Sequence, residues 1–237
     1  MCTVTFLSSD NQSFVLTSNR DEQGSRPAAF LPNFIKINDL EILCPIDAKA
    51  KGTWIATAPH HTVCLLNGAY FPHIPKQQYR QSRGQVVLDS FLFDSSDAFL
   101  ENYNLTDIEP FTLVMVNHNP LSLTELIWDG KEKNISKKDI SKPAIWSSVT
   151  LYSPEIVAQR KIWFEDFLRN TDTNSGEHIV DFHRFGGDGN KENDVLMNRN
   201  GKFLTVSITS ITVDKISQKM RYFDLVNQQE KTLVFGN

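Results

Sequence analysis

Hydrophobic and polar positions in the first seventeen residues follow the pattern of a β-hairpin. Residues 3–7 and 14–17 are rich in apolar and β-branched side chains, and residues 8–13 between them are polar and typical of a turn. Similar apolar runs continue along the chain. They predict further strands at residues 41–46, 52–56, 61–66, 111–116, 123–128, 205–213, 222–225 and 233–235.

Helical spacing of apolar residues appears in three places. One helix is predicted to begin near Ser82, and a second segment, capped by Asp97, to run through Tyr103. A longer helix is predicted after Ser153, a good N-cap residue that is followed by Pro154 at the first helical position. The glycine-rich, polar stretch 186–201 is predicted to be a loop.

The order of these elements is strands, helices, strands, helix, strands. Helices inserted between mostly antiparallel strand sets predict two sheets packed face to face, with the helices outside. No internal repeat or linker divides the chain, so residues 1–237 are predicted to form a single domain.

Composition and charge narrow the range of partners. Of the residues, 40% are hydrophobic and 22% charged, and the formal net charge is -4 without any basic stripe. Nucleic acid is therefore an unexpected partner, and no apolar run is long enough for a membrane-spanning helix. The expected partner is a small-molecule substrate or ligand, and the oligomeric state is left open.

Three cysteines stand at positions 2, 44 and 64, an odd number that gives no disulfide framework. Cys44 and Cys64 lie inside apolar strands and are predicted to be buried, inert thiols. Free thiols and the absence of a secretory signal at the start favour a cytoplasmic location.

The geometry of the first hairpin places several polar groups together. If Leu7 faces Phe14, paired residue numbers sum to 21 and Cys2 lies opposite Asn19. Arg20 and Asp21 then come immediately beyond, so that a thiol, a guanidinium and a carboxylate meet at the open end of the hairpin.

This grouping suits nucleophilic chemistry. Aminopeptidases usually remove an initiator Met before a residue as small as Cys, which would make Cys2 the N-terminus. Its α-amino group, with an ordinary pKa of roughly 7.7–8.0, could then act as the base for its own thiol. Arg20 would favour the thiolate, and Asp21 could hold the ammonium group or orient the substrate.

Several short stretches resemble one family. The chain is similar to the NRDE family, also called the transport and Golgi organisation 2 family, whose Asn-Arg-Asp-Glu string stands at residues 19–22. The resemblance covers most of the chain and rests on Met1-Cys2-Thr3-Val4, Thr17-Ser18-Asn19-Arg20-Asp21-Glu22, Gly52-Thr53-Trp54, Leu66-Asn67-Gly68, Ser82-Arg83-Gly84 and, more weakly, Thr205-Val206-Ser207.

The family is grouped with the N-terminal-nucleophile hydrolases, beside the penicillin V acylase and bile-salt hydrolase types. The resemblance implies an α+β fold, a four-layer αββα sandwich of two mostly antiparallel sheets flanked by helices. It also implies a catalytic set of Cys2 as nucleophile, Arg20 and Asp21 beside it, and Asn67 donating to an oxyanion. The implied reaction is hydrolysis of a non-peptide C–N amide bond.

Two departures from the acylase pattern support an alternative. The relatives have a second Asn in the middle of the chain, where Ser147 and Ser148 stand here, and an Arg near the C-terminal strand. Arg221 is the nearest downstream arginine, and nothing in the sequence places it in the site. The alternative is a binding or carrier protein without turnover, for haem or an acyl-lipid metabolite.

Some of the remaining candidate site residues also have a purely structural interpretation. Asn19, Trp54 and Ser147 are the predicted substrate-binding residues, although Trp54 also suits core or pocket-wall packing. Asn67 before Gly68 is a turn signal as well as an oxyanion donor. No cofactor or metal is predicted, because the calcium-like alternation at residues 188–194 has Asn193 in place of the required Gly.

Overall fold

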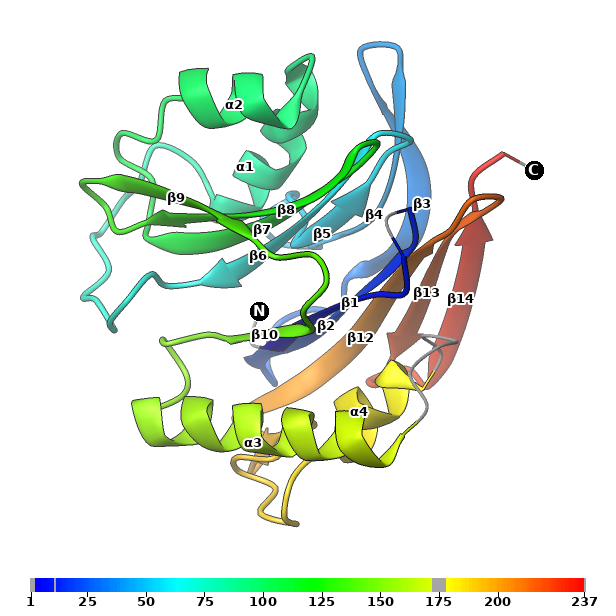
Figure 1. Ribbon diagram of the computed structural model, residues 1–237. Helices are drawn as coiled ribbons and strands as arrows, with labels where there is room; N and C mark the ends of the chain where they lie inside the picture. Colours follow the sequence, from blue (N-terminus) through cyan, green and yellow to red (C-terminus); the bar gives the residue numbers. More distant parts are fainter. Residues whose placement is uncertain (1–2, 11, 172–177, 237) are drawn as a thin grey trace.

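The computed structural model describes residues 3–10, 12–171 and 178–236. Two antiparallel sheets of seven strands each and four α-helices make up this part of the chain, which is an α+β protein (Figure 1). No helix within these ranges is long and apolar enough to cross a lipid bilayer.

Sheet 1 is assembled from both ends of the chain. Its order is β10-β1-β2-β12-β13-β14, with β11 paired to β12. The strands are β1 (Thr3–Ser8), β2 (Phe14–Gln23), β10 (Ala144–Ser147), β11 (Asn198–Arg199), β12 (Phe203–Val213), β13 (Gln218–Asp224) and β14 (Gln229–Val234).

Sheet 2 follows the order of the sequence from β3 to β9. Its strands are β3 (Phe30–Ile37), β4 (Leu40–Ile46), β5 (Ile55–Thr57), β6 (His61–Asn67), β7 (Phe111–His118), β8 (Leu121–Trp128) and β9 (Lys133–Lys138). Neighbouring strands of this sheet are therefore also consecutive in the sequence, although residues 68–110, between β6 and β7, contain helices.

The helices are α1 (Arg83–Asp89), α2 (Ser96–Asn102), α3 (Pro154–Asn170) and α4 (Ile179–Phe185), with a 3₁₀ turn η1 (Ser90–Leu92) after α1. The predicted helix starts at Ser82 and Ser153 are confirmed as N-cap positions, and Ser82 accepts a hydrogen bond from the Gln85 N–H. The α2 cap is Ser95 rather than Asp97, which lies inside the first turn.

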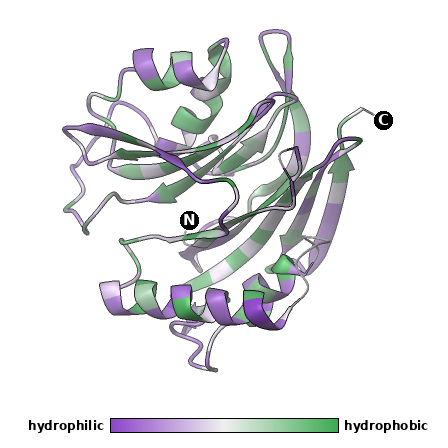
Figure 2. Ribbon diagram, viewed as in Figure 1, coloured by the Kyte–Doolittle hydropathy of each residue, from purple (hydrophilic) through white to green (hydrophobic). Residues whose placement is uncertain are grey.

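Residues of β2 show how the sheets are covered on both faces. Phe14 and Leu16 pack in a cluster between the two sheets, whereas Val15 packs in a cluster with Phe164 of α3 and Phe182 of α4. Successive strand side chains point to opposite faces, so a strand buried on both faces is apolar without alternation. Helix α3, by contrast, carries both hydrophobic and hydrophilic residues along its length (Figure 2).

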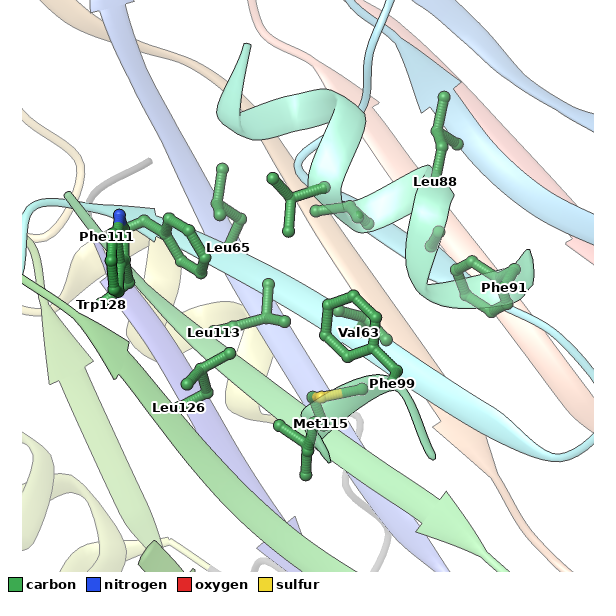
Figure 3. Packing of buried hydrophobic residues seen from close by; sticks show 14 of the residues in the cluster. Val63, Leu65, Leu88, Phe91, Phe99, Phe111, Leu113, Met115, Leu126 and Trp128 are labelled. Atoms are coloured by element: carbon green, nitrogen blue, oxygen red, sulfur yellow. The ribbon is translucent and has the colours of Figure 1, made fainter. Parts of the chain in front are cut away.

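Sheet 2 is covered in the same way by α1, η1 and α2. Val63, Leu113 and Met115 from the sheet pack against Leu88, Phe91 and Phe99 from these helices (Figure 3). The hydrophobic clusters therefore lie between the sheets and on the helix-covered face of each sheet.

The register of the first hairpin differs from the prediction by one residue. Ser8 pairs with Phe14 and Thr3 with Asn19, so that paired numbers sum to 22 rather than 21. The turn is one residue shorter than predicted, because Ser8 belongs to the strand and the Ser9 N–H donates to the Ser13 carbonyl. In addition, β2 continues through Gln23, so residues 19–22 are strand and not the loop beyond it.

Elements with weak sequence signals escaped prediction: β3, β9, β10 and α4. The exposed, lysine-rich β9 lies at the edge of its sheet and has no apolar alternation, and α4 has seven residues. His61 begins β6, within the predicted strand; it is 5% exposed and stacks on Phe91 at 4.3 Å between ring centroids.

Candidate functional site

A polar cavity of about 350 Å³ opens where β2, the segment between β4 and β5, the end of β6 and the start of α1 meet. Its charged lining consists of three arginines and three acids, and neutral polar side chains and Trp54 complete much of the wall. The charged and neutral polar lining residues are Arg20, Arg26, Arg83, Glu22, Asp47, Glu109, Thr53, Asn67 and Ser82.

Arg20 is fixed at this cavity from two sides. Its side chain is 6% exposed, Nη2 donates to the Asp47 Oδ2 at 2.5 Å, and its guanidinium carbon lies 4.6 Å from the ring centroid of Trp54. An ion pair and a cation–π contact together hold the guanidinium in one place. Arg20, predicted to be catalytic, and Trp54, predicted to bind substrate, therefore line the same cavity.

Asp47 is the centre of the charged group. It accepts hydrogen bonds from Arg20 and Arg26, and from the backbone N–H groups of Lys49 and Ala50. Burial alone would raise the pKa of Asp47, but the bonds from Arg26 and Ala50 and the charge of Arg20 hold the pKa at about 2. The carboxylate therefore stays ionised and positions both arginines.

Replacement of this carboxylate should be costly. We expect Asp47→Asn to lower the free energy of unfolding by about 2–3 kcal/mol, because it leaves two partly buried guanidinium groups without their shared counter-charge. Urea denaturation measures the change. The control is Asp139→Asn, at an exposed acid bonded to Ser141, where we expect a much smaller change. Equal effects of the two variants would contradict the role of Asp47.

Asn67 ends β6 and lines two cavities, the polar one and a smaller neighbour of about 120 Å³. Gly68 follows with a φ of +86°, which a residue with a side chain rarely adopts, and its N–H donates to the Pro110 carbonyl. Asn67 is thus the last residue of a strand, directly before a glycine of positive φ, and lies at the cavity.

Ser147 lines the smaller cavity together with Ser148. In the ladder, Ser147 pairs with Thr3, and the Ser148 hydroxyl donates to the Asn67 carbonyl at 2.7 Å. Ser148 therefore contacts the backbone of Asn67, whereas Ser147 shares only the lining of the smaller cavity with it.

Asn19 and Asp21 point to the other face of sheet 1. The Asn19 amide donates to the carbonyls of His183 and Val195, and Asp21 accepts from the hydroxyls of Tyr152 and Thr205. Both are buried, at 0% and 3% exposure. Neither is among the residues that line the polar cavity.

Two motifs that are distant in the sequence meet at the cavity wall through their glycines. The Thr53 N–H donates to the Gly84 carbonyl at 3.1 Å, and a Cβ added at Gly52 would lie 2.5 Å from the Gly84 carbonyl carbon. The close approach of the two backbones leaves no room for a side chain at Gly52. It brings the Gly52-Thr53-Trp54 and Ser82-Arg83-Gly84 stretches to one site.

Trp54 carries an unused hydrogen-bond donor. Its side chain is almost fully buried, lines the polar cavity and has no hydrogen-bond partner at Nε1. Buried donors are nearly always paired in native proteins, so an unpaired one at a cavity is a candidate contact for a ligand acceptor.

Cys2 lies outside the described residues. Thr3, which follows it in the sequence, pairs with Asn19 on one side and with Ser147 on the other. The predicted burial of the other two thiols is confirmed: Cys44 and Cys64 are 0% exposed, and burial raises the pKa of each to about 12.

Several charged residues of the cavity were not identified from the sequence. Arg26, Asp47 and Glu109 come from three separate segments and meet through the pairing of the strands. Arg221, whose place was left open, lies away from the cavity wall and bonds to Glu230 on the neighbouring strand. The part of the chain that the structure describes contains no group of three or more His, Cys, Asp or Glu side chains arranged to hold a metal ion.

Comparison with known families gives one assignment. Residues 1–228 match the family described as TANGO2: Transport and Golgi organisation 2. A search of curated proteins gives no match. The family match covers nearly the whole chain and agrees with the resemblance carried by the stretch around residues 19–22. The chain therefore belongs to the transport and Golgi organisation 2 family.

Proposed function

We propose that the protein is a hydrolase of the N-terminal-nucleophile type, with Cys2 as nucleophile and a small, polar, non-peptide amide as substrate. In this proposal residues 1–237 form one domain, a four-layer αββα sandwich. The placement of α1 and α2 over sheet 2, and of α3 and α4 over sheet 1, supports the assignment.

The observation that carries the proposal is the meeting of Arg20 and Asn67 at one cavity. These residues are 47 positions apart in the sequence, and both belong to the catalytic set that the resemblance implied. Thr3 supports it further, since the residue adjacent to Cys2 pairs with the strand of Arg20 and with Ser147.

The proposed reaction proceeds in two steps. The Cys2 α-amino group takes the thiol proton, and the thiolate adds to the amide carbonyl carbon, where Asn67 donates to the oxyanion. The C–N bond then breaks, and the amine leaves with the proton held by the α-amino group. Water cleaves the thioester, releasing the carboxylic acid and restoring the thiol.

The lining of the cavity favours a polar substrate. Three guanidinium groups and three carboxylates neutralise one another across a space of about 350 Å³, and the buried Trp54 Nε1 in its wall has no hydrogen-bond partner among the described residues. These walls suit a small molecule with hydrogen-bonding groups better than the apolar faces of haem.

A second candidate is binding without turnover on the same fold. It is favoured by the position of Arg221, which faces Glu230 and not the cavity, and by Ser147 in place of the second Asn. Retention of Met1 in the mature protein would support this candidate, because the α-amino base of Cys2 would then be absent.

The experiment that tests hydrolysis is an amide library incubated with protein purified without a tag. We expect release of an amine and a carboxylic acid from some members, and no release with Cys2→Ala. Release that persists in Cys2→Ala, or no release from any member by a protein that lacks Met1, would contradict the proposal.

Asn67 offers a sharper test of the oxyanion role. We expect Asn67→Ala to lower kcat by about 100- to 1,000-fold with little change in KM, because the donor acts mainly on the transition state. Asn134→Ala, at an exposed position of β9, is the matched control and should leave both constants unchanged. A change in KM alone would assign Asn67 to substrate binding instead.

A further inference from the structure

The segment between β6 and α1 exposes large apolar side chains beside the polar cavity. It leaves the cavity wall at Asn67 and returns to it at Ser82. Within five positions it carries Tyr70, Phe71 and Ile74, which are 46%, 78% and 94% exposed. Figure 1 shows this segment in cyan, extending away from the sheets at the left of the view.

The segment is fixed to the body of the protein at two positions, Arg80 near its end and His73 between the exposed apolar residues. The Arg80 N–H donates to the Asp107 carbonyl, and His73 Nε2 lies 3.1 Å from the Glu109 carboxylate. Two prolines, Pro72 and Pro75, restrict the backbone near the exposed apolar residues. Such a segment loses little conformational entropy when its tip binds a surface.

Charge near the segment is biased towards the positive. From residue 48 to residue 88 the sequence contains no Asp or Glu, although the whole chain has a net charge of -4. Lys76 and Arg83 pair with the acids Asp107 and Glu109 of a neighbouring segment. Arg80 instead donates to the Asn104 carbonyl, a neutral partner that leaves its charge uncompensated there.

We propose that residues 68–82 dock the protein on a phospholipid bilayer. Phe71 and Ile74 enter the boundary of the acyl chains, Tyr70 lies at the level of the headgroups, and Arg80 binds lipid phosphate. The combination of exposed apolar side chains, tyrosine and a basic residue is typical of interfacial anchors. This proposal does not depend on the reaction of Cys2.

A bilayer fits the shape of the segment better than a protein partner does. A stable protein interface needs roughly 800 Å² on each side, and the apolar residues here form the tip of one connecting segment rather than a broad face. A tip of two or three side chains is enough for reversible contact with lipid, where the apolar phase surrounds each inserted side chain.

The test is co-flotation of the full chain with vesicles of phosphatidylcholine, with and without phosphatidylserine. The test variant is Phe71→Ser with Ile74→Ser. The chain offers a matched control, Phe185→Ser with Ile216→Ser, whose side chains are 77% and 95% exposed at other sites. Both variants remove one Phe and one Ile of nearly equal exposure, so a general loss of surface hydrophobicity affects them alike.

We expect the wild type and the control variant to float with the vesicles, more strongly when phosphatidylserine is present. The Phe71/Ile74 variant should bind at least about 10-fold more weakly, because it loses two buried apolar side chains. Equal loss in both variants, or equal binding of all three proteins, would overturn the proposal. Failure of the wild type to bind vesicles would also overturn it. If, in that case, the Phe71/Ile74 variant alone lost self-association, the segment would be assigned to protein contact instead.

Discussion

In the native protein, iodoacetamide is expected to alkylate Cys2 at least about 1,000-fold faster than Cys44 or Cys64. Cys44 and Cys64 are fully buried, and burial raises the pKa of each thiol to about 12. At pH 8 only about 1 in 10,000 such thiols is ionised, against about 1 in 4 for an ordinary thiol of pKa near 8.5. The proposed thiolate at Cys2 would react faster still.

Peptide mapping reads the three sites separately. Trypsin releases Cys2 in the peptide that ends at Arg20, Cys44 in peptide 37–49 and Cys64 in peptide 52–76. Protein unfolded in urea is the control, because all three thiols should then react at similar rates. Preferential labelling of Cys44 or Cys64 in the native state would contradict their burial, and labelling of none would contradict the reactivity of Cys2.

A second large effect is expected on lowering the pH. His183 is fully buried, and burial followed by the charge of Arg160 lowers its pKa to about 3. Its neutral ring is satisfied on both nitrogens, since Nδ1 donates to the Asn19 side-chain oxygen and Nε2 accepts from the Thr5 hydroxyl. Protonation of Nε2 would break the hydrogen bond from Thr5 and leave a buried positive charge that water cannot solvate.

Two further buried histidines should also lower the stability of the fold as the pH falls. Burial lowers the pKa of His61 and His118 to about 4, with additional contributions from neighbouring histidines. The unfolded chain binds protons near the ordinary pKa of 6.5, whereas the folded chain does not. Stability is therefore complete above pH 6.5 and is lost as the pH falls through 6.5 towards 4. Each histidine contributes up to about 1.4 kcal/mol per pH unit in this window.

Urea denaturation between pH 7.5 and pH 4.5 measures this loss. His61→Phe tests it most cleanly, because His61 stacks on Phe91, and its Nε2 has no hydrogen-bond partner to lose. We expect the free energy of unfolding of the variant to fall less steeply with decreasing pH than that of the wild type. The difference in slope should correspond to about one proton fewer taken up on unfolding. His178→Gln, at an exposed histidine, should follow the wild type; an unchanged slope in His61→Phe would contradict the buried-histidine explanation.

The sequence predicted the strands and helices whose apolar pattern is strong. The hairpin of β7 and β8 and the N-caps at Ser82 and Ser153 belong to this class. Edge strands such as β9 show no alternation of apolar and polar residues, because an exposed, polar strand has no buried face that requires apolar side chains. The first hairpin was shifted by one residue, since turn length cannot be read from a run of six polar residues.

The candidate site was predictable as far as the family resemblance reached. Arg20, Trp54 and Asn67 line one cavity, whereas Asn19 and Asp21 bond on the opposite face of β2 from Arg20. Alternation along β2 separates Arg20 from its two neighbours, and this was missed when the strand was predicted to end at residue 17. Asp47 and Arg26 could not be found, because tertiary pairing alone brings them to Arg20.

The most direct test of Cys2 as nucleophile is the mass of the N-terminal tryptic peptide after an acid quench. Protein purified without a tag is mixed with an activated acyl compound such as p-nitrophenyl acetate and quenched during turnover. The proposal predicts a peptide that begins at Cys2, ends at Arg20 and carries one acyl group. A peptide that keeps Met1 and carries no acyl group, while the compound is still consumed, would contradict it.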